Sequence, residues 1–492
     1  MKDKKQNKRI NGGHRLLFFC ILCLFGLYVA VSYAEEQPQR EQSKTKVILL
    51  HTDNLTYDQY RHPGAQILTG NVQFQHDGVL MYCDSACFYE ATNSFDAFGH
   101  VKMVQGDTLD LVGDMLLYNG LDQLARVRHN VVLTHRESKL YTDSLDYDRL
   151  YELGYFFEGG KLVDKDNVLT SDWGQYSPPT RQAVFNYNVK LENPKFTLIS
   201  DTLNYNTLTS MAEIVGPSNI DSGDNHIYSE SGFYNTQTEE AILLDRSIVT
   251  NKGRKMVGDS LYYDSKSGVG EGFRNVVYTD EVNKNMLTGN YCYYNDSTGY
   301  SMATDSAVAI DYSQRDTMYM HADTFKVYTF YMDTDSMYRE VRSYHKVRSY
   351  RMDVQSVCDS LVFDSRDTCI TMYRDPIVWN GGQQVLGEVI KVYLNDSTID
   401  RIHVIDQTLS VERIDSVHYN QVAGKEMTSY FRDGEMYETW VNGNVYVDYY
   451  MFDDDSLMIG LNYTETTELK LFMKARKMEK IWMPASTGVI YP

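Results

Sequence analysis

Apolar and polar residues alternate in short segments along this chain, and one such segment returns at a nearly constant interval. In the stretch Gly113–Gly120, Asp114, Leu116 and Tyr118 fall on one face of an extended strand, and the residues between them fall on the other. The Asn-Gly pair that follows has the chemistry of a turn. The pattern predicts a strand of about five residues that ends in a turn.

The acidic residue that opens this segment recurs about every 29 residues, with an aromatic residue four positions after it. We call these acidic residues the anchors: Asp84, Asp114, Asp143, Asp172, Asp201, Glu230 and Asp259. The aromatic residues are Phe88, Tyr118, Tyr147, Tyr176, Tyr205, Tyr234 and Tyr263, and a looser series continues through Asn290, Asp323, Asp359 and Glu388. A fixed period of this length predicts stacked units, each of which buries its apolar face against its neighbours.

A second phrase, often asparagine followed by valine, lies about midway between anchors, as at Asn71, Asn130, Asn188 and Asn275. Each unit is therefore expected to contain two strands, which build two facing sheets. No segment has a sustained helical period, so the predicted fold is all-β: an extended two-sheet solenoid of 29-residue repeats. Eleven or twelve rungs would span on the order of 55 Å. If the sheets splay, an apolar groove runs between them.

The interior of this solenoid is expected to be lined by the residues two and four positions after each anchor. The candidate groove-lining residues are Leu116, Tyr118, Leu145, Tyr147, Leu203, Tyr205, Leu261, Tyr263, Phe325 and Leu361. The same residues could instead form a plain hydrophobic core, and the aromatic series could be a structural spine, because stacked aromatic residues stabilise neighbouring rungs whatever they bind.

The anchors could also form a row of metal ligands. The nine-residue glycine-rich period of calcium-binding β-rolls is absent, however, and each anchor begins a strand, where it can accept hydrogen bonds from nearby backbone N–H groups. We therefore predict a structural role for the anchors, and no metal or cofactor.

The first 34 residues have the pattern of an export signal. Six basic residues precede an apolar run from Leu16 to Val31, and Ser32-Tyr33-Ala34 forms a cleavage pattern. An uncleaved membrane anchor is the alternative, and residues 35–46 would be a linker. Removing residues 1–34 takes away six basic residues and one acidic residue, so the net charge changes from −20 to −25. An acidic exported protein is a poor partner for nucleic acid.

Little in the sequence supports catalysis. It contains no H-E-x-x-H, G-x-S-x-G or phosphate-binding glycine motif. Paired carboxylates could make a polysaccharide lyase or hydrolase, but the acidic residues repeat in every unit, whereas an active site is built once. The five cysteines beyond residue 34 are too few for a disulfide scaffold, and most are predicted to be small buried residues. We predict that the protein is not an enzyme.

Three stretches together, Leu68–Phe74, Met81–Ala86 and Ala97–Val101, resemble the organic-solvent-tolerance (OstA, LptA-like) family, whose pattern includes Gly-Asn-Val, an Asp before Ala, a Tyr, and Gly-x-Val. The tail from Gly424 to Val445 resembles long members of that family. The resemblance covers about residues 45 to 490. It divides the chain into tandem repeats at 47–330 and a continuing OstA-like C-terminal β region at 331–492.

The resemblance implies a taco-like β-jelly-roll in the periplasm of Gram-negative bacteria that carries lipopolysaccharide, or a related lipid, with its acyl chains inside a groove. Implied partners are an inner-membrane jelly roll and an outer-membrane assembly, with possible end-to-end self-association through edge strands. The alternative is a structural or adhesive solenoid with a filled interior, whose outer faces bind proteins or glycans. An open, apolar and solvent-accessible interior would favour transport.

Overall fold

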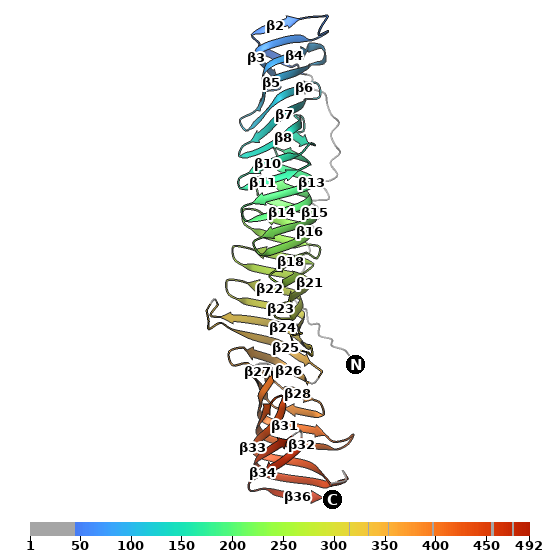
Figure 1. Ribbon diagram of the computed structural model, residues 1–492, viewed down its shortest axis with the longest axis vertical. Helices are drawn as coiled ribbons and strands as arrows, with labels where there is room; N and C mark the ends of the chain where they lie inside the picture. Colours follow the sequence, from blue (N-terminus) through green and yellow to red (C-terminus); the bar gives the residue numbers. More distant parts are fainter. Residues whose placement is uncertain are drawn as a thin grey trace, which may run out of the picture.

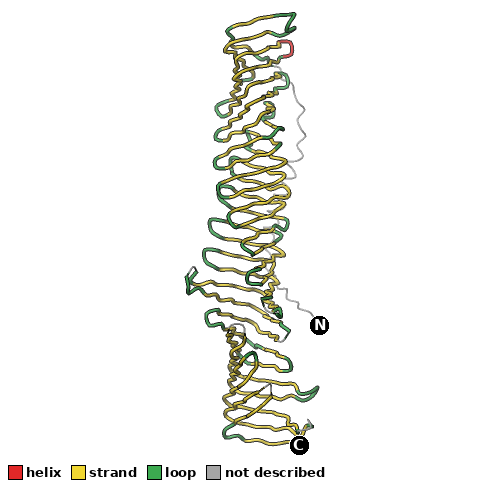
Figure 2. Tube along the Cα trace, viewed as in Figure 1, coloured by secondary structure: helices red, strands yellow, loops and turns green. Residues whose placement is uncertain are grey.

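The computed structural model describes residues 45–492 except 314, 333, 353, 396–397, 454–456 and 475–476. It contains 36 strands joined into one antiparallel sheet, and its one helical turn within these residues is η1 (Glu90–Thr92) (Figure 2). The strands stack along a long axis, from β2 at one end to β36 at the other (Figure 1). The all-β prediction is confirmed. The predicted export signal, and residues 35–44 of the predicted linker, lie outside the described residues.

Twenty of the strands are long, with 11 to 18 residues each. They are β3 (Gln66–His76), β4 (Val79–Tyr89), β5 (Ser94–Gln105), β6 (Leu109–Asn119), β7 (Leu124–His135), β8 (Ser138–Asp148), β13 (Gln182–Asn193), β14 (Phe196–Asn206), β15 (Met211–Ser222), β16 (Asn225–Asn235), β21 (Val269–Asp280), β22 (Asn285–Asn295), β23 (Tyr300–Asp311), β24 (Met318–Phe330), β25 (Tyr338–Tyr350), β26 (Val354–Asp364), β31 (Thr398–Arg413), β32 (Tyr419–Arg432), β33 (Glu435–Phe452) and β34 (Met458–Lys474).

The other strands are short and form pairs that act as the two halves of one long strand. For example, both β9 and β10 pair with β8, along its two halves. The pairs are β1 (Ile48–His51) with β2 (Asn54–Tyr57), β9 (Leu153–Phe156) with β10 (Gly160–Asp164), β11 (Asn167–Ser171) with β12 (Trp173–Ser177), β17 (Glu240–Leu244) with β18 (Ile248–Asn251), β19 (Arg254–Val257) with β20 (Ser260–Asp264), β27 (Cys369–Tyr373) with β28 (Ile377–Asn380), β29 (Gln383–Leu386) with β30 (Val389–Asn395), and β35 (Lys477–Trp482) with β36 (Thr487–Tyr491).

The long strands bend near their middle, at the asparagine-valine phrase in strands such as β7 and at the anchor in strands such as β6. Between β5 and β6 the register shifts between Phe98 and Val101, where Gly99 and His100 have φ values of 75° and 42°. The same left-handed pair occurs at Asn130 and Asn188, each together with the residue before it. Two such residues form a bulge that turns the strand, so its two halves lie in opposite halves of a folded sheet.

This geometry corrects the predicted strand length and unit. The prediction of five-residue strands was wrong. The bulge interrupts the alternation of apolar and polar residues, so each half of a long strand has the pattern of a separate short strand. A 29-residue unit therefore contributes two bent strands, each of which crosses both halves of the sheet. The result is about 28 layers, which at about 4.8 Å each span on the order of 130 Å rather than 55 Å.

The anchors hold these bends in place. The carboxylate of Asp84 lies 2.7 Å from His100 Nδ1, and that of Asp114 accepts a 2.7 Å hydrogen bond from Asn130 Nδ2. Similar bonds join Asp172 to Asn188 and Asp259 to Asn275. Each bond links the bend of one strand to the bend of the next. The partner is thus a neighbouring side chain, not the local backbone N–H group that the sequence indicated.

The hairpin turns alternate between two edges of the folded sheet. The first edge contains the turns at residues 77–78, 136–137, 165–166 and 194–195, and the second edge contains those at 90–93, 120–123, 149–152 and 207–210. We call the line along which the two edges face each other the seam. Inward-facing apolar residues form a first core, from Val47 to Leu261, and a second core, from Val276 to Leu469. No helix of the described chain is long and apolar enough to span a membrane.

Candidate functional site

The ten candidate groove-lining residues all lie on inward-facing strand positions. Nine are at most 3% exposed, and Tyr263 is half-buried. Leu116 to Tyr263 lie on β6, β8, β14 and β20, within or against the first core, whereas Phe325 on β24 and Leu361 on β26 belong to the second core. Their placement in the interior agrees with the prediction from the alternation of apolar and polar residues in the sequence. Contact with lipid stays a prediction.

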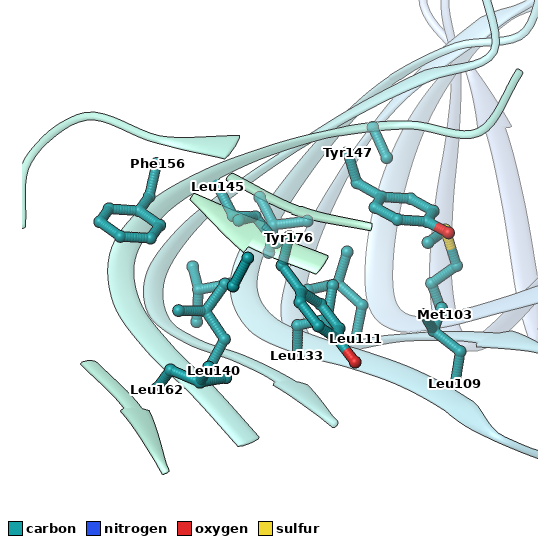
Figure 3. Packing of buried hydrophobic residues seen from close by; sticks show 14 of the residues in the cluster. Met103, Leu109, Leu111, Leu133, Leu140, Leu145, Tyr147, Phe156, Leu162 and Tyr176 are labelled. Atoms are coloured by element: carbon teal, nitrogen blue, oxygen red, sulfur yellow. The ribbon is translucent and has the colours of Figure 1, made fainter. Parts of the chain in front are cut away.

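Large side chains fill the first core. The rings of Phe74 and Phe95 stack with their centroids 4.1 Å apart, and Tyr118 follows at 5.2 Å from Phe95. Figure 3 shows Tyr147 and Leu133, from opposite halves of the folded sheet, inside this interior. Because such close packing leaves few voids, the protein itself occupies the space between the two halves here.

Polar side chains close the seam over the first core. The Tyr118 hydroxyl, on the second edge, lies 2.7 Å from His76 Nδ1, on the first edge. It also accepts a 2.5 Å hydrogen bond from Arg149 Nη1, and Arg149 Nη2 donates to the His76 carbonyl oxygen at 3.1 Å. All three side chains are buried. Burial lowers the pKa of His76 and raises that of Tyr118, so both are held neutral.

Similar contacts cross the seam at regular intervals. Among the described residues they join Asn93 to Val47, Gln123 to Asp77, Glu152 to Gln105, Tyr176 to His135, Tyr205 to Asp164 and Asn167, Thr236 to Asn167, Ser210 to Lys165, and Glu239 to Lys195. The Asp164 carboxylate is 2% exposed and accepts hydrogen bonds from Tyr205 and Ser138. We call this series the seam contacts. They close the first core along its length.

The seam contacts predict a loss of stability in mild acid. Burial lowers the pKa of both His76 and His135 below the usual value. The unfolded chain then binds more protons, so the stability from these groups is complete above about pH 6.5 and is lost as pH falls through the folded values. Between pH 7.5 and 5.5 the thermal midpoint should drop, and drop less in a His76→Asn/His135→Asn variant.

His100 provides the matched control for this pH measurement. Its hydrogen bond to Asp84 raises its pKa, so its contribution has the opposite sign: it is present in mild acid and is lost as pH rises. A His100→Asn variant should therefore be at least as acid-sensitive as the wild type. Identical pH profiles for the wild type and the double variant would contradict the assignment of His76 and His135.

The interior opens beyond the last seam contacts. The aromatic series shows this at equivalent positions: Tyr205 is 0% exposed, Tyr234 and Tyr263 are half-buried, and Tyr294 is 40% exposed. Against the second core, many inward-facing apolar residues are only partly buried, among them Leu287, Met320, Phe363, Ile370, Val378, Val385, Ile402 and Leu471. We call this part of the molecule, from Met256 to Leu471, the open interior.

Small residues face inward in both cores. Ala125, Ala183 and Ala212 are buried in the first core, and Ala303, Ala307 and Ala322 are buried in the second. The sequence-based interpretation missed both the seam contacts and the greater exposure of the second core. The partners of each seam contact are far apart in the sequence, so no local pattern indicated them.

The anchors do not cluster around a common point. They occupy every second layer, about 10 Å apart, and not every layer as the sequence had indicated. In the part of the chain that the structure describes, no three histidine, cysteine, aspartate or glutamate side chains are placed to hold a metal ion. The cysteines there are free, and four of the five are buried.

A folded antiparallel sheet of bent strands around an apolar interior defines an elongated β-jelly-roll. The family model described as OstA-like protein matches residues 44–201 and 196–259, so this part of the chain is similar to the OstA-like family, in agreement with the resemblance. OstA-like proteins have roles related to lipid or lipopolysaccharide transport, and the family is one of transport and binding in the periplasm. No curated protein matches the chain. The family match ends at residue 259, where the interior opens.

Proposed function

We propose that the protein is a periplasmic lipopolysaccharide-transport bridge that shelters lipid acyl chains between the two halves of its folded sheet during outer-membrane assembly. The observation that carries this proposal is the open interior, where inward-facing apolar residues of many successive strands remain partly exposed. The OstA-like match supports the same kind of role.

The physical task of such a bridge is to replace water around hydrocarbon. Each exposed methylene costs about 0.8 kcal/mol in water, so acyl chains cannot cross an aqueous compartment unaided. Successive layers offer similar apolar surfaces, which gives a path of nearly equal sites. Direction must then come from an energy source elsewhere, and we assign no such source to this chain.

The proposal extends to the ends of the molecule. β36 is exposed along its whole length and pairs with β34, so it presents an edge to which a further strand can add. We propose inner-membrane and outer-membrane transport components, or a second copy of the chain, as partners at the two ends. We also propose that residues 1–34 direct export, and that the tandem repeats end at residue 330, where the C-terminal β region begins.

One observation favours the alternative, a structural or adhesive solenoid. The first core is filled by its own side chains, as expected of a protein that uses only its outer faces. The open interior favours transport, so bound lipid distinguishes the two functions.

The test is to purify the protein from a Gram-negative periplasm and to identify bound lipid by mass spectrometry. Lipopolysaccharide or a related lipid should copurify with the wild type. A Phe363→Asp variant should retain less than about a tenth of it, because a carboxylate in the apolar interior costs several kcal/mol. Val362→Asp, on the outer face of the same strand, is the control. Absence of lipid from the wild type would support the alternative function.

A further inference from the structure

The two cores differ in how far their inward-facing side chains are exposed. Over the first core the seam contacts bridge the two edges, and Phe185 and Tyr205 are at most 1% exposed. Over the second core the inward-facing Met320 and Phe363 remain partly exposed. The change occurs between Glu239, the last residue of the seam contacts, and Tyr294, which is 40% exposed.

We infer that acyl chains are held only in the open interior, and that the first core is a closed spacer that carries no lipid inside. This inference rests on the proposed function and gives it a location. Beyond residue 259, the open interior also lies outside the OstA-like match.

Entry of lipid into the first core would require two costly changes. The seam contacts would have to break, so buried groups such as His135 and the Tyr118 hydroxyl would lose the hydrogen bonds that they make across the seam. Each buried polar group left unpaired costs about 1–3 kcal/mol. The packed rings of Phe74 and Phe95 would also have to separate, which exposes apolar surface.

The chemistry of the open interior selects hydrocarbon as its occupant. The strands around it are paired with neighbours on both sides, as β24 is with β23 and β25, so their backbone N–H and C=O groups are already bonded in the ladders. A peptide would find few partners for its own backbone there and would leave those groups unsatisfied. An acyl chain needs none.

Four phenylalanines allow a matched test with one photoreactive residue, p-azidophenylalanine. Phe185 faces the first core and Phe363 faces the open interior. Phe98 and Phe273, 39% and 40% exposed, lie on outer faces next to the first core and next to the open interior, respectively. Each single variant of the full chain is mixed with purified lipopolysaccharide, irradiated, and assayed for lipid-linked protein. A circular dichroism melt of each variant confirms that it is folded.

Crosslinking at Phe363 at several times the level at Phe185, Phe98 and Phe273 is the expected result. Equal crosslinking at Phe363 and Phe185, both above the outer positions, would overturn the closed spacer but leave the proposed function intact. Crosslinking at Phe185 alone would also overturn it. No crosslinking at either inward position, or equal crosslinking at all four, would count against the proposed function itself.

Discussion

Replacing Leu203 with aspartate is expected to unfold the layers around β14, not merely to block lipid. Leu203 is 0% exposed and packs within the first core between its cross-strand partners Phe185 and Ile214. Losing a buried leucine costs about 2–5 kcal/mol, and burying an unpaired carboxylate adds several kcal/mol more. In circular dichroism melts, the first unfolding transition should occur at a lower temperature than in the wild type. Hydrogen exchange should show the loss of amide protection near residues 183–220.

The control is Ile199→Asp on the same strand. Ile199 is 50% exposed and pairs with Lys190 and Asn219, so the same charge enters water beside a cation. Its free energy of unfolding should stay within about 0.5 kcal/mol of that of the wild type. If the two variants lose equal stability, the alternation of inward and outward faces on β14 is misassigned.

Deleting residues 201–229 is expected to leave a folded protein that is shorter by about 10 Å, the thickness of two layers. The deletion joins the first half of β14, which ends just before the anchor Asp201, to the second half of β16, which begins at the anchor Glu230. Tyr234 then takes the place of Tyr205 at the seam. Small-angle scattering should show the shorter maximum dimension, because each layer contacts mainly its neighbours.

A half-unit deletion, of residues 201–215, is the matched control. It joins two half-strands that both belong to the first edge, so the chain would have to reverse direction at the bend. This variant should aggregate or fail to fold. A folded half-unit variant, or an unfolded whole-unit variant, would contradict the assignment of two bent strands to each repeat.

The alternation in the sequence was sufficient to predict the repeat, the all-β class and the inward positions of Leu116, Leu145 and Leu203. Those features depend on local order, because residues two apart on a strand share a face. The family resemblance gave the folded shape of the sheet, and the match over residues 44–259 agrees with it.

The bend and the seam contacts could not be predicted in the same way. The left-handed conformation of Gly99 and His100 was read as the start of a new strand, because glycine next to a polar residue has the composition of a turn. His76, Tyr118 and Arg149 are up to 73 residues apart in the sequence, and no local pattern brings them together. Their contact exists only after the sheet has folded.

The seam contacts also determine how the molecule responds to torque. A tube with a joined wall resists twisting far more than the same wall slit along its length, because a slit lets the two edges slide past each other. The first core, with bonds from Val47 to Glu239, is the joined tube, and the second core is the slit one. Antiparallel sheets have a natural twist that can vary from layer to layer. A rotation imposed on one end of the molecule would thus be absorbed mainly in the second core, while the first core turns as a unit.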